Sequence, residues 1–371
     1  MIMKIAIIHD WLTNMGGAER VILAFHEIFP DAPIYTSVYN PDKLPEEFRK
    51  MDIRTSFIQK LPKAKTKYNI YLPLMPVAFE QFDLSEYDVV LSSSSSCAKG
   101  VITRADTLHI CYCHTPMRYA WDFYHEYKQN APKWQRKFIP FLMNYIRMWD
   151  RLSADRVDYF IANSSAVARR IKKHYRRDAV VINPPVDTNF YTPKDEDEDY
   201  FLIVSRLVEY KRIDIAIEAF NDLGLPLIII GDGPERSKLQ KMAKSNIRFL
   251  GRLPDEEVKE YYAKCRAFIF PGEEDFGITP LEAQASGRPV IAFGKGGVLD
   301  SVIDGLTGIF FKDQNKESLK EAIKRFEKID FSKETIRKHA EKFDVKIFKK
   351  KIYDFIINKY NDYRNSSVYH F

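Results

Sequence analysis

The chain has 371 residues, of which 45% are hydrophobic and 29% charged. This length exceeds the size at which one hydrophobic core keeps growing, so two domains are expected, and the composition excludes a largely disordered protein. The four cysteines are too few for a disulfide framework and none of their spacings suits zinc, so we expect buried thiols in a reducing compartment.

The net charge of +6 belongs to the first half of the chain. Residues 1–185 hold 26 Lys/Arg and 19 Asp/Glu, a balance of +7, whereas the rest hold 31 and 32, a balance of −1. An anionic partner would therefore be met by the first half, although a solvated basic face gives the same pattern.

No segment predicts a membrane span or a secretory signal. No stretch approaches the ~20 apolar residues that cross a bilayer. The first residues run directly into a strand pattern, without the charged, apolar and small-residue regions of a signal peptide. We expect a cytoplasmic protein, either free or attached to a surface.

Short apolar runs alternate with helical patterns along nearly the whole chain, and the helical repeat is clear over Ala18–Phe29. This alternation predicts an α/β protein with parallel sheets and helices on both sheet faces. The predicted strands form two series, Ile5–Ile8, Val89–Leu91, Leu108–Cys113, Tyr159–Ala162 and Val180–Ile182, then Phe201–Val204, Leu227–Ile230, Phe249–Leu250, Ala267–Phe270, Val290–Phe293 and Ile309–Phe311.

The two series predict two doubly wound, Rossmann-like domains facing a cleft, with ligands at the carboxyl ends of the strands. We place the domains at 1–185 and 186–345, and expect a helix at about 346–366 to pack back on the first. The stiff turn Asn183–Asp187 marks the join. The acidic linker Tyr191–Asp199 after it resembles an Asp-x-Asp metal site, but solvated linker carboxylates lack the required fixed geometry.

In the second half, Glu274 and Glu282 are separated by a glycine-containing loop and a helix start. Thr279, Pro280 and Glu282 fit the N-cap, N1 and N3 positions, so Glu282 could simply close a capping box. The alternative is functional. Free N–H groups at a helix start attract phosphate, and a nearby carboxylate accepts hydrogen bonds from sugar hydroxyls.

Cations also follow the first strand of this half, at Arg206 and Lys211. Lys211 stands before a helix, where the helix dipole opposes a cation. A bound diphosphate would turn this conflict into a site, and exposed surface cations are the alternative. The turn after Leu227–Ile230 has glycine at Gly231 and Gly233, but Arg236 replaces the third glycine of a dinucleotide fingerprint.

In the first half, the first strand ends at His9-Asp10 and leads to Gly16-Gly17 before a helix. Two glycines allow close backbone approach to a ligand and leave N–H groups for an anion. His114 ends the strand Leu108–Cys113, where an imidazole is either structural or catalytic.

In this order, these motifs resemble the family 4 retaining glycosyltransferases of the GT-B fold, over nearly the whole chain. The Glu-x7-Glu element at Glu274–Glu282 is the most specific of them. The resemblance implies that Arg206 and Lys211 hold a donor diphosphate, Glu274 the transferred sugar and Glu282 the ribose. It also implies donor contacts at Gly16, Gly17, Gly231, Arg252, Leu253, Phe276, Gly277, Ile278 and Thr279, a sugar contact at His114, and acceptor-side contacts at Asp10, Gly17, Arg118 and Trp121.

Within the family, His9–Leu12 and His114–Asp122 resemble bacterial polysaccharide mannosyltransferases that use GDP-mannose and extend a polyprenyl-diphosphate-linked oligosaccharide. Ser205, Arg212 and Asp275 depart from residues common in the family, but no charged ligand is lost. The resemblance implies retaining transfer that needs neither metal nor cofactor. A UDP-sugar donor, a nucleotide-sugar epimerase or hydrolase, and a nucleic-acid-binding module remain alternatives, although no RNA-binding aromatic signature supports the last.

The stretch Lys133–Arg151 mixes cations with aromatic residues, a composition suited to an anionic membrane surface. We predict membrane contact through Lys133, Trp134, Arg136 and Lys137, and hence a peripheral location on the inner face of the plasma membrane. The alternative is a core-facing helix, interrupted at Pro140.

Overall fold

The computed structural model describes residues 3–368, with side chains to residue 365. The chain divides into unit 1, which is Met1–Asn183 with Lys349–Phe371, and unit 2, which is Pro184–Phe348. The join thus falls within the turn that the sequence marked.

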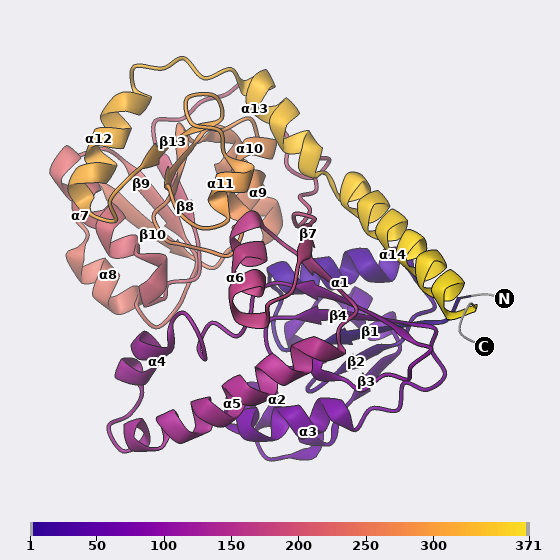
Figure 1. The fold of residues 1–371 in the computed structure, drawn as a ribbon. Coiled ribbons are helices and arrows are strands. Elements are labelled where there is room, and N and C mark those ends of the chain that lie inside the picture. The colour runs from indigo at the N-terminus through magenta and orange to yellow at the C-terminus, as the bar shows by residue number, and fades with distance from the viewer. Residues whose placement is uncertain (1–2, 369–371) are drawn as a thin grey trace. The chain divides into compact units, whose positions relative to one another are not determined.

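Each unit contains one parallel sheet (Figure 1). Unit 1 has seven strands in the order β3-β2-β1-β4-β5-β6-β7, and unit 2 has six in the order β10-β9-β8-β11-β12-β13. In both, the chain moves outward from a central strand and then crosses to its other side, so the order reverses between β1 and β4 and between β8 and β11. These are two Rossmann-like domains, as predicted, and ligands bind such sheets at the switch point.

The elements of unit 1 are, in chain order, β1 (Ile5–His9), α1 (Gly17–Ile28), β2 (Ile34–Thr36), β3 (Ile53–Thr55), α2 (Ala64–Lys67), α3 (Met75–Glu80), β4 (Val89–Ser94), β5 (Leu108–Cys113), α4 (Tyr124–Asn130), α5 (Ile139–Ser153), β6 (Tyr159–Ala162), α6 (Ser165–Tyr175), β7 (Ala179–Val181) and most of α14 (Val345–Val368).

The elements of unit 2 are β8 (Phe201–Val204), α7 (Ile213–Leu223), β9 (Leu227–Ile230), α8 (Arg236–Met242), β10 (Ile247–Gly251), α9 (Asp255–Lys264), β11 (Ala267–Phe270), α10 (Thr279–Ala285), β12 (Val290–Phe293), α11 (Val298–Ser301), β13 (Gly308–Phe311), α12 (Lys316–Phe326) and α13 (Lys333–Ala340).

Helices cover both faces of each sheet, which is why the central strands are buried throughout. In unit 1, α3 and α5 pack on the face that carries Ala6, Ile8 and Val90, and α1 lies on the other (Figure 1). In unit 2, α7, α8 and α12 share one core cluster with the sheet, and α9, α10 and α11 share the other. Continuous apolar runs such as Leu227–Ile230 suit strands buried on two faces.

The predicted strands are confirmed, with end shifts, but β2 and β3 were missed. Each has three residues, and β3 is only partly buried, so neither gives a long apolar run. Cys111 and Cys113 lie in one cluster on the same sheet face, and all four cysteines are free and buried.

The last helix packs on unit 1 from Lys349 onward. Lys349 pairs with Glu27 at 2.7 Å, the Tyr353 ring lies 6.3 Å from Phe29, and the Tyr363 hydroxyl donates to the Ala105 carbonyl at 2.6 Å. The chain therefore returns to its first domain.

The carboxylates of the acidic linker contact cations of unit 2. Asp197 lies 2.5 Å from Arg288 and 2.7 Å from Lys333, and Asp199 lies 3.1 Å from Arg266. These ion pairs fasten the linker to the sheet end opposite the switch point.

Candidate active site

A small pocket lies at the switch point of unit 2, at the carboxyl ends of β8 and β11. Its walls include Ser205 and Lys211, which follow β8, and Pro271, Gly272 and Glu274, which follow β11. Loops far apart in sequence meet here because β8 and β11 are neighbouring strands.

Lys211 and Glu274 form an ion pair across this pocket, with side chains 15% and 20% exposed. The pair joins the loop after β8 to the loop after β11. A partly buried pair holds both groups in fixed positions, and a bound ligand meets a cation and a carboxylate side by side.

Arg206 belongs to the same loop after β8 as Lys211, and its side chain is exposed. Its guanidinium has no ion-pair partner among residues 3–368. An unpaired cation at a strand end is available to an anion.

Glycines allow the loops around Arg206 to approach closely. A Cβ at Gly231 would collide with the Ser205 carbonyl, and one at Gly233 with the backbone of Leu207. Gly231 also has a φ of +131°, which favours glycine. Gly231 therefore supports the Arg206 turn, and its direct contact with a donor stays a prediction.

Arg212 occupies a left-handed backbone conformation, with φ of +51°. Glycine adopts this conformation without the strain that a side chain brings. Its guanidinium donates to Asp214 at 3.0 Å. This ion pair compensates part of the strain in front of α7.

Of the two alternatives for Glu282, the capping box is wrong. The N-cap is Ile278, which makes no side-chain cap bond, and the Glu282 N–H donates to the Ile278 carbonyl at 3.0 Å. The Glu282 carboxylate is 4% exposed and accepts a hydrogen bond from the Tyr262 hydroxyl at 2.9 Å. Because α10 begins at Thr279, one residue earlier than its sequence signals suggest, Glu282 is the fourth helical residue and the Thr279–Glu282 capping box does not form.

Other predicted donor residues are not among those that line the pocket. Phe276 is 3% exposed and its ring lies 6.3 Å from Phe343, so its side chain serves the core and not the site. Gly277, with φ of +87°, turns the chain into the start of α10 at Ile278 and Thr279. After β10, Arg252 is exposed and Leu253 packs on the core, two strands from β8.

In unit 1, Asp10 follows β1 and is 2% exposed. Its carboxylate accepts hydrogen bonds from the Ser95, Ser96 and Ala98 N–H groups at 2.6–2.9 Å, and from the Ser95 hydroxyl at 3.1 Å. Asp10 therefore fixes the loop after β4. Its contact with an acceptor stays a prediction.

His114 follows β5, and its Nε2 lies 2.8 Å from the Ser93 hydroxyl. Burial, and then the neighbouring His9, lower the pKa of His114 to about 3. The ring is consequently neutral near pH 7 and carries one N–H. Gly16 is the N-cap of α1 and Gly17 its first residue.

Trp121 anchors the segment after His114. Its indole N–H donates to the buried Asp150 of α5 at 2.7 Å, and its ring stacks on His174 at 4.7 Å. Asp150 also pairs with Lys99, which is 1% exposed. Nearby, the Arg118 guanidinium lies 4.2 Å from the centre of the Phe123 ring. Acceptor contacts of Trp121 and Arg118 stay predictions.

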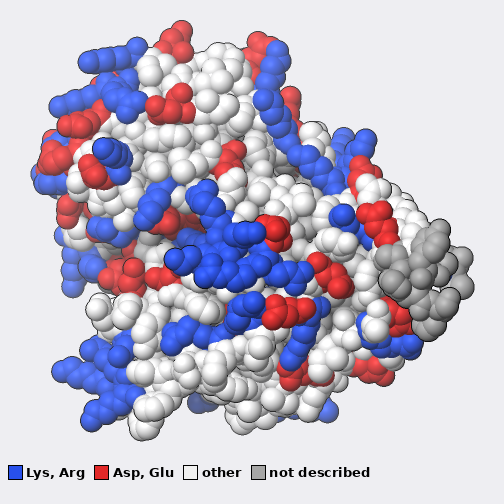
Figure 2. Space-filling model, viewed as in Figure 1, with Lys and Arg blue, Asp and Glu red and all other residues white. Residues whose placement is uncertain are grey.

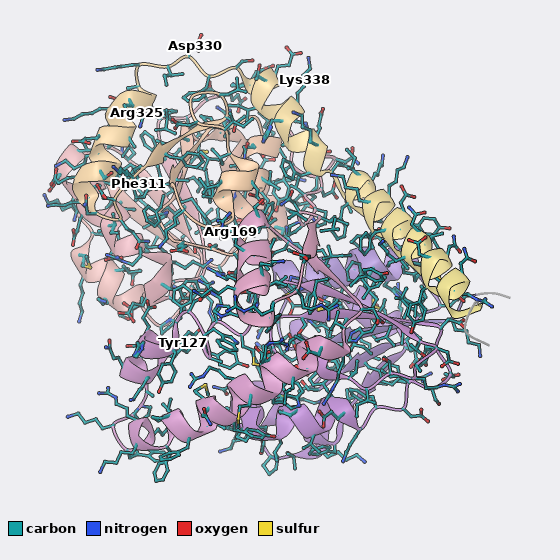
Figure 3. The ribbon with its side chains drawn as sticks, in the orientation of Figure 1. Tyr127, Arg169, Phe311, Arg325, Asp330 and Lys338 are labelled. Carbon is teal, nitrogen blue, oxygen red and sulfur yellow. The ribbon has the colours of Figure 1, made fainter. Side chains whose placement is uncertain are left out.

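Exposed cations of unit 1 gather on two surfaces, among others. Lys and Arg side chains gather over α6 (Figure 2), where Arg169, Lys173 and Arg176 are exposed. Arg169 projects from this helix (Figure 3). The second surface is the segment that leads into α5, where Lys133 and Lys137 are exposed.

Sequence reasoning missed several residues of the two sites. Tyr262 lies in the middle of a helix and binds Glu282, and Ser93 lies within a buried strand and binds His114. The only signal for them is a polar group at a core position, which requires a hydrogen-bond partner. No group of His, Cys, Asp or Glu that could hold a metal occurs within residues 3–368.

Two family models match this chain, Glycosyltransferase Family 4 over residues 15–190 and Glycosyl transferases group 1 over residues 188–343. The chain belongs to the glycosyltransferases built from these two domains. This agrees with the motifs at Glu274–Glu282 and at the strand ends.

Similar proteins include mannosyltransferases. A GDP-mannose-dependent alpha-mannosyltransferase of Corynebacterium glutamicum is 38% identical over 107 residues, 29% of this chain and 26% of that protein. The O-antigen chain mannosyltransferase RfbU of Salmonella typhimurium is 27% identical over 212 residues, 54% of this chain and 60% of that protein. This glycosyltransferase spans about half the length of the curated relatives it matches.

The solved structure of HepE from Anabaena in complex with UDP has a TM-score of 0.73 at 18% identity, covering 96% of this chain and 100% of that chain. The two proteins share a fold. This glycosyltransferase therefore has the GT-B class of domains.

Proposed function

We propose that this glycosyltransferase transfers a hexose from a nucleotide sugar, with retention of configuration, to a hydroxyl of an acceptor. The observation that carries the proposal is the Lys211–Glu274 pair at the switch point of unit 2, with Arg206 on the same loop as Lys211. In this arrangement Lys211 and Arg206 hold the diphosphate, Glu274 a sugar hydroxyl and Glu282 the ribose.

The chemistry requires stabilisation of negative charge on the leaving diphosphate while the anomeric carbon becomes electron-poor. The partly buried Lys211 and the exposed Arg206 supply this electrostatic effect. The acceptor oxygen forms the new bond to the anomeric carbon as the bond to phosphate breaks, and the acceptor proton passes to the leaving phosphate. Since these steps use residues of the chain, we expect activity to survive EDTA, and complete loss restored only by a divalent ion would contradict this scheme.

Mannose from GDP-mannose is the donor we favour. The support is that two relatives are mannosyltransferases, one of them GDP-mannose-dependent. HepE, a relative in fold alone, was solved with UDP, so a UDP-sugar is the alternative donor. Thermal shifts with GDP, UDP and ADP test this choice, with the largest stabilisation expected from GDP.

The acceptor we favour is a polyprenyl-diphosphate-linked oligosaccharide at an anionic membrane. Support comes from α5, whose residues Phe141, Tyr145, Met148 and Leu152 share one helix face and are 43–79% exposed. A solvated helix face is ordinarily polar, so a contiguous apolar stripe marks an interaction surface.

The segment before α5 continues this surface. Trp134 and Phe138 are 69% and 68% exposed, and Lys133, Arg136 and Lys137 are exposed between them. Aromatic rings with neighbouring cations suit the headgroup region, where each cation gains roughly 1 kcal/mol from anionic lipid. No helix within residues 3–368 has the length and apolarity to cross a bilayer, so attachment to one face is the proposed mode.

Vesicle flotation tests the membrane proposal. The protein should float with anionic but not neutral vesicles, less so in high salt, and replacing Arg136 and Lys137 with Glu should abolish flotation. Lys338→Glu, on exposed α13 of unit 2, is the matched control that should still float. Failure of the wild type to float with anionic vesicles at low salt would contradict the proposal.

A further inference from the structure

Four polar side chains of unit 1 form a continuous chain that ends at His114. Glu19 Oε1 lies 3.6 Å from His9 Nε2, His9 Nδ1 lies 3.2 Å from the Ser93 hydroxyl, and that hydroxyl lies 2.8 Å from His114 Nε2. This chain of polar side chains crosses three neighbouring strands at the carboxyl edge of the sheet. His9 and Ser93 are direct partners in the register of β1 and β4.

The inner members are almost completely buried. Ser93 is 0% exposed, His9 3% and Glu19 8%. Buried polar groups require partners, and each of these finds its partner in the next member. Gly16 belongs to the same arrangement, because a Cβ there would lie 3.0 Å from Glu19 Oε2.

The Glu19 carboxylate at one end sets the direction of hydrogen-bond donation among these side chains. An ionised carboxylate only accepts, so a neutral His9 places its proton on Nε2, beside Glu19, and leaves Nδ1 as an acceptor. Ser93 then donates to His9 Nδ1. The lone pairs of the Ser93 oxygen accept the N–H of His114 Nε2, so His114 Nδ1 carries no proton.

We propose that Glu19, His9 and Ser93 are positioning residues that hold His114 in the Nε2–H tautomer, so that Nδ1 accepts a hydrogen bond from a hydroxyl of the sugar substrate. The substrate part rests on the proposed function, whereas the tautomer does not. Nδ1 has no partner among residues 3–368, and the low pKa of His114 keeps the ring neutral.

Nuclear magnetic resonance of ¹⁵N-histidine-labelled, full-length protein tests the tautomer without substrate. Long-range ¹H–¹⁵N correlations distinguish a protonated ring nitrogen from an unprotonated one, and the His114→Asn variant assigns the signal. We expect Nε2 protonated and Nδ1 unprotonated. A ring protonated at Nδ1, or at both nitrogens, would overturn the proposal.

Glu19→Leu is the decisive variant, because it removes the carboxylate acceptor beside His9 Nε2 and with it the preference that orients the hydrogen bonds among His9, Ser93 and His114. His114 should then shift toward the Nδ1–H tautomer, with kcat lowered about 10-fold and nucleotide affinity unchanged. Glu27→Leu, on the same helix and 57% exposed at its side chain, is the matched control that should change neither. An unchanged tautomer in Glu19→Leu would also overturn the proposal.

The two results separate the possible failures. A tautomer that switches in a protein without sugar-transfer activity would leave the positioning chain standing and remove the proposed function. A wild-type tautomer opposite to the expected one would remove the positioning chain, whatever the activity.

Discussion

Lys211 and Glu274 contact each other although 62 residues of sequence lie between them, because β8 and β11 are neighbours in the sheet of unit 2. Each residue was assigned to a different part of a donor, Lys211 to the diphosphate and Glu274 to the sugar. Their ion pair indicates that the two parts of the site are held together before a donor binds.

Replacing Lys211 with Ala should lower kcat/KM by a factor that corresponds to roughly 2–4 kcal/mol, because a cation is lost beside a doubly charged leaving group. Initial rates of nucleoside diphosphate release in the presence of acceptor measure this. Lys238→Ala, an exposed lysine of α8 that pairs with Glu235, is the matched control. Wild-type kinetics in Lys211→Ala would remove Lys211 from the site.

Glu282→Gln should raise the donor KM about 10-fold, since a charge-assisted hydrogen bond to the ribose becomes a neutral one. The glutamine oxygen still accepts from the Tyr262 hydroxyl, so the fold should be retained. Steady-state kinetics measure the donor KM, and a melting curve tests whether the fold is retained. An unchanged KM would leave Glu282 as a structural partner of Tyr262.

Because His109 is buried, we expect the folded protein to lose stability in acid. Burial lowers its pKa to about 4 in the folded protein, against 6.5 unfolded, so the unfolded chain binds more protons between these values. The contribution of neutral His109 to the free energy of unfolding is complete above pH 6.5. It falls as the pH drops toward 4, and is about 2 kcal/mol smaller at pH 5. Urea unfolding of the wild type and of His109→Asn at pH 7.5 and pH 5 measures it.

The variant should lose about 2 kcal/mol less than the wild type between the two pH values, because Asn does not titrate. Other groups contribute equally to both proteins, so the difference isolates His109. Identical losses would show that His109 does not control this pH dependence.

Breaking the buried pair between Lys99 and Asp150 should destabilise unit 1. Asp150→Asn leaves Lys99 without its counter-charge at 1% exposure, which costs about 3 kcal/mol or more. Replacing both residues with apolar ones, Lys99→Met with Asp150→Leu, should restore part of this. Urea unfolding gives the values, and Asp106→Asn, in an exposed pair with Arg104, should show no measurable change.

Much of the fold followed from the sequence because its central strands are continuous apolar runs with polar residues directly after them. Ser205 and His114 could be placed at strand ends for this reason. The Glu19–His9–Ser93 chain could not, because His9 and Ser93 are 84 residues apart and meet only through strand register. The sequence around Asp10 did not distinguish a ligand-binding carboxylate from one that binds a loop. The capping signals at Thr279 favoured a helix start one residue too late.

The central claim is that the nucleotide sugar is held at the switch point of unit 2, and hydrogen exchange of the full-length protein tests it most directly. Exchange is compared with and without saturating GDP and UDP. We predict slower exchange in peptides that cover residues 205–212 and 272–282, and the same exchange in peptides of α12. No protection at either segment, or protection confined to other parts of the chain, would contradict the account.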